Sequence, residues 1–424
     1  MSAGLDIHPL VRPPEATVTV PGSKSITNRA VLLAALADGR SELSGALFSE
    51  DTRYMIEALR ALGVGVETDE AAARIAVDGC GGRWPATQAD LFVGNAGTAM
   101  RFLAAALCLG RGRYRIDGTA RMRERPIQEL VDSLRQLGVK ITCEGRGTPP
   151  VVIEARGLPG GIAELSAERS SQFLSALMLV APYAERALTI RLRGTVIAQP
   201  YVDLTHEMMR QWGVELVRDG YREFRVESGQ RYRPARYAIE PDASSAHYFW
   251  AAAALTRGRV RVEGLTLDSL QGDVRFAPLL GEMGAGVSAE GNAMTVIGDR
   301  LAGIDVDLNA MSDTVPTLAA IAPFASSPVH IRNVAHLRWQ ESDRLRAVAT
   351  ELTRLGVRVE ERDDGLSVWP SPITPAAVHT YDDHRIAMAF ALIGLKVPGI
   401  RIEDPGCVAK TFPDYFARLE ELRR

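Results

Sequence analysis

Cysteine is scarce in this sequence, and the four cysteines lie far apart. They form neither a CxxC pair nor a dense framework: Cys80, Cys108, Cys143 and Cys407. We interpret them as free thiols of a reducing compartment. No apolar run approaches the roughly 18–20 residues that cross a bilayer, and the first twenty residues lack the basic and apolar regions of a secretory signal. We therefore expect a cytoplasmic protein rather than a secreted or membrane-spanning one.

An excess of charge of either sign is also missing. The 424 residues include 49 basic and 52 acidic side chains, a formal net charge of −3, so no overall basic field would attract nucleic acid or an anionic membrane. The histidines and cysteines show no metal-ligand spacing, no GxGxxG follows a strand, and PGSKS at residues 21–25 is not a P-loop. We expect small-molecule partners, with no metal and no cofactor.

An amphipathic helix that ends in glycine recurs along the chain. The pattern EALRALGVGVE at residues 57–67 returns near residues 132, 207, 278 and 350. Each copy places a glycine where a left-handed helix C-cap is needed. These glycines are 71 to 75 residues apart: Gly63, Gly138, Gly213, Gly284 and Gly356. A fixed period of this kind indicates internal repeats.

Six almost wholly apolar segments form a second series between these helices. They begin with small polar or charged residues, 68 to 75 residues apart, at Ser25, Asn95, Ser170, Ser244, Ser312 and Asp382. A helix that is apolar on all sides has no solvent face, so it must be buried. Each unit is therefore predicted as apolar helix, strand, amphipathic helix, strand, strand. Six such units account for the chain and give an α/β fold.

The units are predicted to divide into two groups of three. The sixth unit stops after a helix at 412–422, while strand-like pieces at 5–8 and 16–20 precede the first unit. We infer that the N-terminus completes the sixth unit. Breaks at Pro21-Gly22 and Glu240-Pro241 then predict one domain of residues 1–20 plus 241–424 and an inserted domain of residues 22–240. A continuous solenoid of six units stays open at this point.

The polar N-termini of the apolar helices predict a site for anions, because helix dipoles and free backbone N–H groups favour negative charge there. Capping explains any single Ser, Asn or Asp. It does not explain Arg29, Arg101 and Arg385, cations near helix N-termini, where the dipole disfavours them. We expect these arginines to face a ligand.

Three loops add charged residues, each with an ordinary alternative. Arg121, Arg123 and Arg125 lie within residues 118–126, and such a loop is as readily solvated as functional. Glu341 and Arg344 are spaced as a simple i,i+3 ion pair. A lone lysine such as Lys410 is usually solvated.

Seven segments resemble the signature segments of the 5-enolpyruvylshikimate-3-phosphate (EPSP) synthase family. They run in order from Pro21 to Phe416: PGSKSITNRA, GNAGTAMR, RERPI, SSQF, ESDRL, YDDHR and AKTFPDYF. The resemblance implies two domains, each of three βαβαββ repeats around buried helices (an inside-out α/β barrel), with the active site in the inter-domain cleft. It also implies a transferase, 3-phosphoshikimate 1-carboxyvinyltransferase, of chorismate and aromatic amino acid biosynthesis. Such an enzyme joins the enolpyruvyl group of phosphoenolpyruvate to the 5-hydroxyl of shikimate 3-phosphate and releases phosphate, without metal.

The resemblance also implies the substrate-binding residues. Phosphoenolpyruvate would contact Lys24, Gly97, Arg125, Gln172, Arg344, Arg385 and Lys410. Shikimate 3-phosphate would contact Lys24, Ser25, Arg29, Ser170, Ser171, Gln172, Tyr201, Asp313 and Gln340. Both substrates are polyanions, so holding them together requires concentrated positive charge and oriented donors. Arginine suits this task because its planar fork grips carboxylate and phosphate bidentately.

The implied reaction is an addition followed by an elimination. A base must take the hydroxyl proton while an acid protonates the methylene carbon. Two carboxylates stand at matching positions, and we assign Asp313 as the base and Glu341 as the proton donor, with Lys24 as a rival donor. Asp313 has an alternative role as the N-cap of a helix over 314–324.

The sequence departs from the family pattern at four positions. Gln340 stands where a lysine commonly precedes the glutamate, and Ala198 where a serine usually touches the shikimate phosphate. His336 replaces a common asparagine, and Phe102 a frequent proline. The first two should weaken binding of shikimate 3-phosphate, since a charged hydrogen bond is worth roughly 1.5–3 kcal/mol.

Two rival functions are kept. The first is an enolpyruvyl transferase acting on a UDP-linked amino sugar, a family that commonly carries a reactive cysteine in the loop matching residues 118–126; this loop has none. The second is a non-catalytic sensor of phosphorylated metabolites, against which the intact Asp313, Glu341 and Lys410 argue. The two-domain plan needs no partner subunit, so we expect a monomer.

Overall fold

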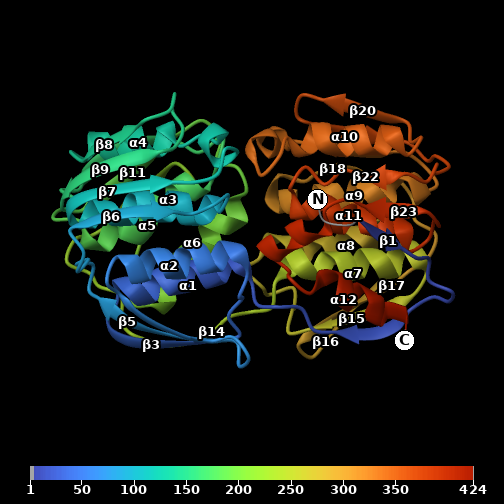
Figure 1. Ribbon diagram of the computed structural model, residues 1–424, viewed down its shortest axis with the longest axis horizontal. Helices are drawn as coiled ribbons and strands as arrows, with labels where there is room; N and C mark the ends of the chain where they lie inside the picture. The colour runs from blue at the N-terminus through green and yellow to red at the C-terminus, as the bar shows by residue number, and fades with distance from the viewer. Residues whose placement is uncertain (1–3, 424) are drawn as a thin grey trace. The chain divides into compact units, whose positions relative to one another are not determined.

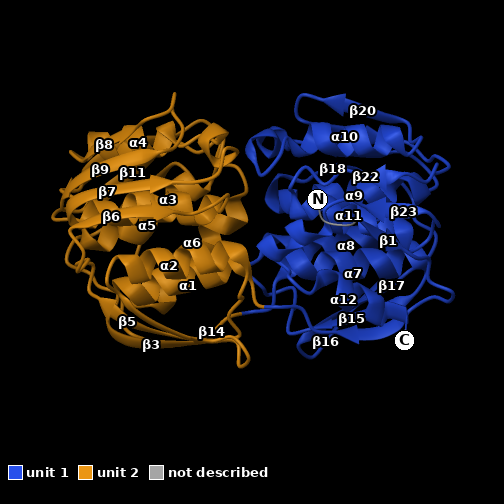
Figure 2. Ribbon diagram, in the orientation of Figure 1, with its two compact units in different colours: residues 1–21, 240–424 blue, residues 22–239 orange. Residues whose placement is uncertain are grey.

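The computed structural model describes residues 4–423, which form two compact units (Figures 1 and 2). Unit 2 comprises Gly22–Ile239. Unit 1 joins the N-terminal segment that ends at Pro21 to the part of the chain that begins at Glu240. The chain therefore passes between the units twice, at residues 21/22 and 239/240.

Unit 2 contains three four-stranded sheets of the same design. In each sheet a parallel pair of strands continues into an antiparallel hairpin, and the later strand of that hairpin lies inside the sheet. The second sheet has the order β6 (Gln88–Phe92), β7 (Arg111–Asp117), β9 (Val151–Arg156), β8 (Lys140–Cys143). The third has the order β10 (Gly161–Ser166), β11 (Leu188–Arg193), β13 (Glu223–Val226), β12 (Val217–Asp219). The first has the order β14 (Arg236–Ala238), β3 (Asp38–Ser44), β5 (Arg74–Cys80), β4 (Gly65–Asp69).

Unit 1 repeats this design in two sheets and shortens it in a third. Its complete sheets are β2 (Glu15–Val18), β15 (Arg259–Glu263), β17 (Ala293–Ile297), β16 (Gly286–Glu290), and β18 (Asp305–Asp307), β19 (Val329–Arg332), β21 (Gly365–Val368), β20 (Val359–Arg362). The third sheet has three strands, β22 (Ala377–Val378), β23 (Ile400–Ile402) and β1 (Leu5–Ile7).

The N-terminus completes two repeats rather than one. β1 pairs antiparallel with β23 of the sixth repeat, as the sequence predicts. β2 instead pairs parallel with β15 and so supplies the first strand of the fourth repeat. β14, the strand just before the second crossing, likewise supplies the first strand of the first repeat by pairing with β3. Each unit is thus closed by a strand whose chain then leaves for the other unit.

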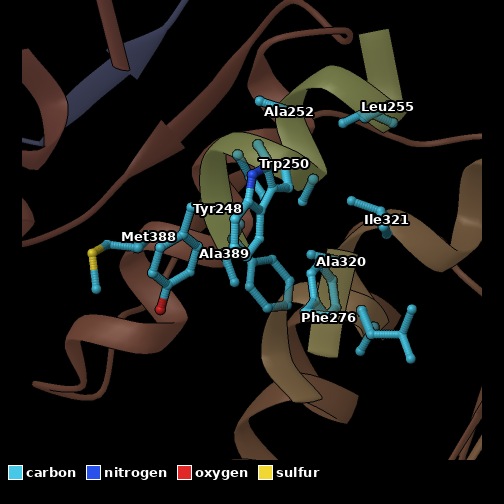
Figure 3. Packing of buried hydrophobic residues seen from close by; sticks show 14 of the residues in the cluster. Tyr248, Trp250, Ala252, Leu255, Phe276, Ala320, Ile321, Met388 and Ala389 are labelled. Carbon is cyan, nitrogen blue, oxygen red and sulfur yellow. The ribbon is translucent and has the colours of Figure 1, made fainter. Parts of the chain in front are cut away.

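Six apolar helices lie inside the units. Every residue of α3 (Gly97–Ala106), α9 (Val315–Ile321) and α11 (His384–Gly394) is buried. α1 (Lys24–Leu36), α5 (Gln172–Val180) and α7 (Ala243–Thr256) are buried beyond their first residues, apart from the last residue of α7. In unit 1, side chains of α7, α9 and α11 meet in one core, with Trp250, Ile321 and Ala389 among them (Figure 3). The predicted burial of these segments is confirmed.

Amphipathic helices alternate with the buried ones. They are α2 (Glu50–Ala61), α4 (Gln128–Gln136), α6 (Gln199–Gln211), α8 (Phe276–Glu282), α10 (Arg344–Arg354) and α12 (Tyr415–Glu420). All five recurrent glycines that follow them adopt positive φ, between 79° and 112°, the left-handed conformation that glycine accepts without strain. The five predicted C-caps are confirmed.

Two further glycines lie where the chain packs closely against a buried helix. This close packing predicts that a larger residue at either position lowers the stability of the fold. A Cβ at Gly79 in β5 would clash with the carbonyl oxygens of Ala34 and Ala37 at the end of α1, and a Cβ at Gly298 after β17 would clash with that of Ala253 in α7. Gly79→Ala and Gly298→Ala should each destabilise the fold by about 1–3 kcal/mol, measured as a lower Tm. Gly286→Ala, on open strand β16 with no carbonyl closer than 3.7 Å, is the control. An unchanged Tm for both test variants would contradict the close packing.

Candidate functional site

Polar side chains of unit 2 gather at the N-terminal ends of α1, α3, α5 and α6. The Gln172 amide donates to the Thr98 hydroxyl at 3.4 Å, which joins α5 to α3. The Arg29 guanidinium donates to the Tyr201 carbonyl at 3.2 Å, which joins α1 to α6, and it lies 5.1 Å from the Phe102 ring of α3. We call this group the unit 2 cluster: Lys24, Ser25, Arg29, Asn95, Gly97, Thr98, Arg125, Ser170, Ser171, Gln172 and Tyr201.

Arg29 carries a buried charge among neutral acceptors. It is 2% exposed and donates to the Thr205 hydroxyl at 2.8 Å and the Ser25 carbonyl at 2.9 Å. Burial lowers the pKa of Arg29 to about 10, so the group stays charged at neutral pH. These acceptors, like the Tyr201 carbonyl, carry no formal charge, so they only partly offset the desolvation of the cation.

Lys24 and Arg125 have acceptors within unit 2. The Lys24 ammonium forms an ion pair with Asp51 of α2, with 3.2 Å between Nζ and Oδ2. Arg125 is 3% exposed and donates to the backbone and side-chain oxygens of Asn95 at 2.9 and 3.0 Å. A Cβ at Gly97 would lie 2.7 Å from Arg125 Nη2, so the missing side chain at Gly97 leaves room for this guanidinium.

The loop of three arginines separates into two roles. Arg121 pairs with Glu124 on the surface, and Arg123, which is exposed, pairs with the buried Asp117 at 2.5 Å. Arg125 alone among the three is buried. The loop therefore contributes Arg125 to the unit 2 cluster.

Unit 1 has its own cluster, built around the buried Arg344. This guanidinium, 2% exposed, donates to three carboxylates: Nη1 to Asp313 at 2.9 Å, Nη2 to Glu341 at 2.6 Å and Nε to Asp383 at 2.9 Å. Burial lowers its pKa, but the three carboxylates outweigh burial and hold the pKa above its ordinary value. The predicted ion pair of Glu341 with Arg344 is present as one part of this larger arrangement.

Arg385 and Asp313 complete the unit 1 cluster: Asp313, Glu341, Arg344, Asp383 and Arg385. Arg385 Nη2 donates to Asp313 Oδ2 at 2.6 Å. Asp383 caps α11 by accepting from the Arg385 backbone N–H at 3.0 Å. Asp313 is not a helix N-cap: it lies in the 3₁₀ turn η5 (Asn309–Thr314), and Thr314 is the N-cap of α9. A kink at Met311 within η5 delays the helix, so the alternative role of Asp313 was wrong.

The remaining predicted residues of unit 1 flank this cluster. Gln340 is half-buried, next to Glu341 in sequence. Lys410, 6% exposed, is the last residue of the 3₁₀ turn η8 (Pro405–Lys410). Burial raises the pKa of the Asp382 carboxyl, and the charge of Lys410 opposes this rise. His336 donates to or accepts from the Ser312 hydroxyl at 2.9 Å, and burial lowers its pKa to about 4. In unit 2, Ala198 is the N-cap of α6 with a left-handed φ of 47°.

Two functional candidates, Asp51 and Asp273, escaped the sequence analysis, and so did the main partner of a third, Asp383. Asp51 looks like an ordinary acid in the first turn of α2 and pairs with Lys24 because of the tertiary fold. Asp383 belongs to the YDDHR segment, but its bond to Arg344 spans 39 residues. Asp273, in the 3₁₀ turn η4 (Gly272–Arg275), has no sequence signal at all.

Asp273 is a buried acid beside the unit 1 cluster. It is 2% exposed and accepts a hydrogen bond from the Ser244 hydroxyl. Burial raises its pKa to about 7; Asp313 and Asp242 act in the same direction, while Arg385 and the Ser244 bond oppose it. Near neutral pH this carboxyl is therefore only partly ionised.

Two negative findings apply to residues 4–423. This part of the chain contains no group of three or more His, Cys, Asp or Glu side chains placed to hold a metal ion. It also contains no helix long and apolar enough to cross a membrane.

The raised pKa of Asp273 predicts a pH-dependent stability. Between pH 4 and 7 an unfolded chain releases this proton while the folded protein keeps it, so the stability that the group contributes falls as pH rises through this window. Asp273→Asn mimics the protonated acid and should raise Tm at pH 8, with the gain vanishing towards pH 4. Asp268→Asn, a surface aspartate, serves as the control with no such trend. A gain that is equal at pH 4 and pH 8 would contradict the raised pKa.

Comparison with known proteins finds members of one family that match almost the whole chain. The family model for EPSP synthase (3-phosphoshikimate 1-carboxyvinyltransferase) matches residues 11–419. A 3-phosphoshikimate 1-carboxyvinyltransferase from Nostoc sp. is 54% identical over 418 residues, 98% of both chains. The structure of EPSP synthase from Acinetobacter baumannii has a TM-score of 0.82 at 27% identity, covering 98% of this chain and 97% of that one. The enolpyruvyl transferase NikO from Streptomyces tendae shares the fold, with a TM-score of 0.79 at 20% identity over 99% of this chain and 97% of that one. The chain belongs to the EPSP synthase family.

Proposed function

We propose that this chain transfers the enolpyruvyl group of phosphoenolpyruvate to the 5-hydroxyl of shikimate 3-phosphate and releases phosphate, as a 3-phosphoshikimate 1-carboxyvinyltransferase of aromatic amino acid biosynthesis. One observation carries the proposal beyond family membership. Asp313 and Glu341, the two groups needed for proton transfer, meet on one buried guanidinium, that of Arg344. We further propose that the protein works as a cytoplasmic monomer and does not bind nucleic acid.

Both units contribute residues to the proposed binding of each substrate. Phosphoenolpyruvate is assigned to Lys24, Gly97, Arg125, Gln172, Arg344, Arg385 and Lys410. Shikimate 3-phosphate is assigned to Lys24, Ser25, Arg29, Ser170, Ser171, Gln172, Tyr201, Asp313 and Gln340. Each set draws on both units, so the proposal requires both units to act on the same two molecules. The oriented donors of the unit 2 cluster and the arginines of the unit 1 cluster suit phosphate and carboxylate groups.

The proposed reaction has two stages, an addition and an elimination, and each stage involves two proton transfers. In the addition Asp313 takes the proton of the 5-hydroxyl, and the hydroxyl oxygen bonds to C2 of phosphoenolpyruvate. The electrons of the double bond move to C3, which Glu341 protonates. In the elimination the Glu341 carboxylate takes a proton back from C3, the double bond forms again, the C2–O bond to phosphate breaks, and the departing phosphate takes the proton that Asp313 holds. Lys24 is the alternative donor to C3. Both carboxylates must be within reach of substrate when these steps occur.

Substrate binding must change the partners of the arginines. Arg344 spends all its guanidinium nitrogens on carboxylates, and Arg385 donates to Asp313. An anionic substrate that takes over one of these donors releases the carboxylate that held it. Binding of phosphoenolpyruvate at Arg344 and Arg385 would thereby free Asp313 to act as a base.

Phosphate release from the purified protein tests the assignment. We expect release with phosphoenolpyruvate and shikimate 3-phosphate together. Release with a UDP-linked amino sugar in place of shikimate 3-phosphate would identify the rival transferase, and binding without release would identify a sensor. Asp313→Asn and Glu341→Gln should each lower kcat by about 10²–10⁴.

The matched control is Asp343→Asn, in the same segment. Asp343 caps α10 by accepting from the Arg346 backbone N–H at 3.1 Å and lies outside the unit 1 cluster, so its kcat should stay within a few-fold of wild type. Full activity of Asp313→Asn would exclude it as the base.

Gln340 gives a second prediction, for affinity. A lysine at this position adds a charged donor, so Gln340→Lys should lower KM for shikimate 3-phosphate roughly tenfold with little change in KM for phosphoenolpyruvate. Gln340→Glu is the control of opposite charge and should raise that KM. Steady-state kinetics with each substrate varied in turn measures both. No gain in affinity from the lysine would remove Gln340 from the shikimate 3-phosphate site.

A further inference from the structure

Glu351 is a fully buried carboxylate that the proposed mechanism does not use. It lies in α10, seven residues after Arg344, so the two side chains share one face of the helix. Its side chain is enclosed, with 0% exposure, and forms an ion pair with Arg354 at 2.9 Å. Burying a carboxylate is costly unless its oxygens are well satisfied. We therefore expect its carboxylate oxygens to accept hydrogen bonds from groups other than Arg354.

The remaining partners of Glu351 are in the segment that leads into α11. The backbone N–H of His379 donates to Oε2 at 3.0 Å, and the hydroxyl of Tyr381 donates to Oε1 at 2.7 Å. These bonds span 28 and 30 residues. One carboxylate thus fixes both a backbone group and a side chain of residues 379–381.

This segment has a strained backbone. Tyr381 and Asp382 both adopt left-handed φ, 56° and 53°, although neither is glycine. Consecutive residues of this kind persist where the surroundings over-determine them. Beyond the Glu351 bonds, the Asp383 N–H donates to the Thr380 carbonyl at 2.9 Å. The turn ends at Asp383, which caps α11 and accepts from Arg344.

We propose that Glu351 is a positioning residue for the unit 1 cluster: it holds the His379–Asp382 turn in the conformation that presents Asp383 and Arg385. Two side chains on one face of α10 then hold the segment through hydrogen bonds. Arg344 binds Asp383 at the end of the turn, and Glu351 binds His379 and Tyr381 at its start. Arg385, two residues beyond Asp383, donates to Asp313. A turn that relaxes would move the two arginines relative to each other. This role rests on the proposed function, which gives these arginines phosphoenolpyruvate to bind.

Three variants separate positioning from simple stability. Glu351→Gln keeps the shape but replaces one acceptor oxygen by a donor, and Tyr381→Phe removes the hydroxyl from a side chain that is 42% exposed. Arg354→Ala is the matched control, because it removes the partner of Glu351 within the helix and leaves both bonds to the turn. We expect Glu351→Gln to raise KM for phosphoenolpyruvate about tenfold and Tyr381→Phe about threefold, with smaller changes in KM for shikimate 3-phosphate. Arg354→Ala should lower Tm without changing KM for phosphoenolpyruvate.

Hydrogen exchange provides a readout that does not depend on activity. In Glu351→Gln the amides of His379 and Asp383 should exchange faster than in wild type, while those of the α9 core stay protected. A Glu351→Gln protein with a lower Tm but unchanged KM for phosphoenolpyruvate and unchanged exchange would overturn the proposal. So would an Arg354→Ala variant that raises this KM as much as Glu351→Gln does. A wild-type protein that releases no phosphate would instead overturn the proposed function, and the exchange of these amides would still decide whether Glu351 holds the turn.

Discussion

Burial of six helices along nearly their whole length is the constraint on which the rest of the structure depends. A helix with no solvent-facing side can offer only packing along its length, as Trp250 and Ile321 do in unit 1. Groups that could meet a ligand are therefore expected at the helix ends, and the N-terminal end favours anions through its dipole and free N–H groups. Arg29 and Arg385 stand near such ends against the dipole. Each is buried and hydrogen-bonded by side chains or carbonyls of neighbouring elements, so the tertiary fold supplies the stabilisation that the helix does not.

The two units neutralise their buried arginines in different ways. Arg29 in unit 2 donates to hydroxyl and carbonyl groups, so an anion that reaches it adds charge complementarity that the protein lacks. Arg344 in unit 1 already contacts three carboxylates, so an anion there must displace one of them. Displacement lowers the gain in binding energy, but it also releases a carboxylate at the moment when substrate arrives. Under the proposed assignment, binding of phosphoenolpyruvate and release of the base Asp313 would then be one event in unit 1.

The sequence predicts those features of the fold that repeat, because a period needs no tertiary information. The buried helices and the five glycine caps follow from residue spacing alone. The destination of β2 does not, since a short strand carries no mark of the sheet it joins. The same limit applies to the site. Asp51 resembles any acid in a first helical turn, and Glu351 resembles one half of an i,i+3 pair with Arg354 on the surface of an amphipathic helix. Their long-range partners, Lys24 for Asp51 and the His379–Asp382 turn for Glu351, are set by the fold.

A residue whose side chain contributes little to the fold can be substituted with little loss of stability. Gln340 is half-buried beside Glu341, and no helix or strand includes it. Ala198 begins α6 through its backbone, so its small side chain is not what starts the helix. Arg344, by contrast, connects α10 to η5 and α11 through its three carboxylates, and its loss would leave buried negative charge unpaired. Under the proposed assignment, a residue such as Arg344 would be fixed by stability as well as by binding, while substitutions at Gln340 and Ala198 would change mainly the affinity for shikimate 3-phosphate.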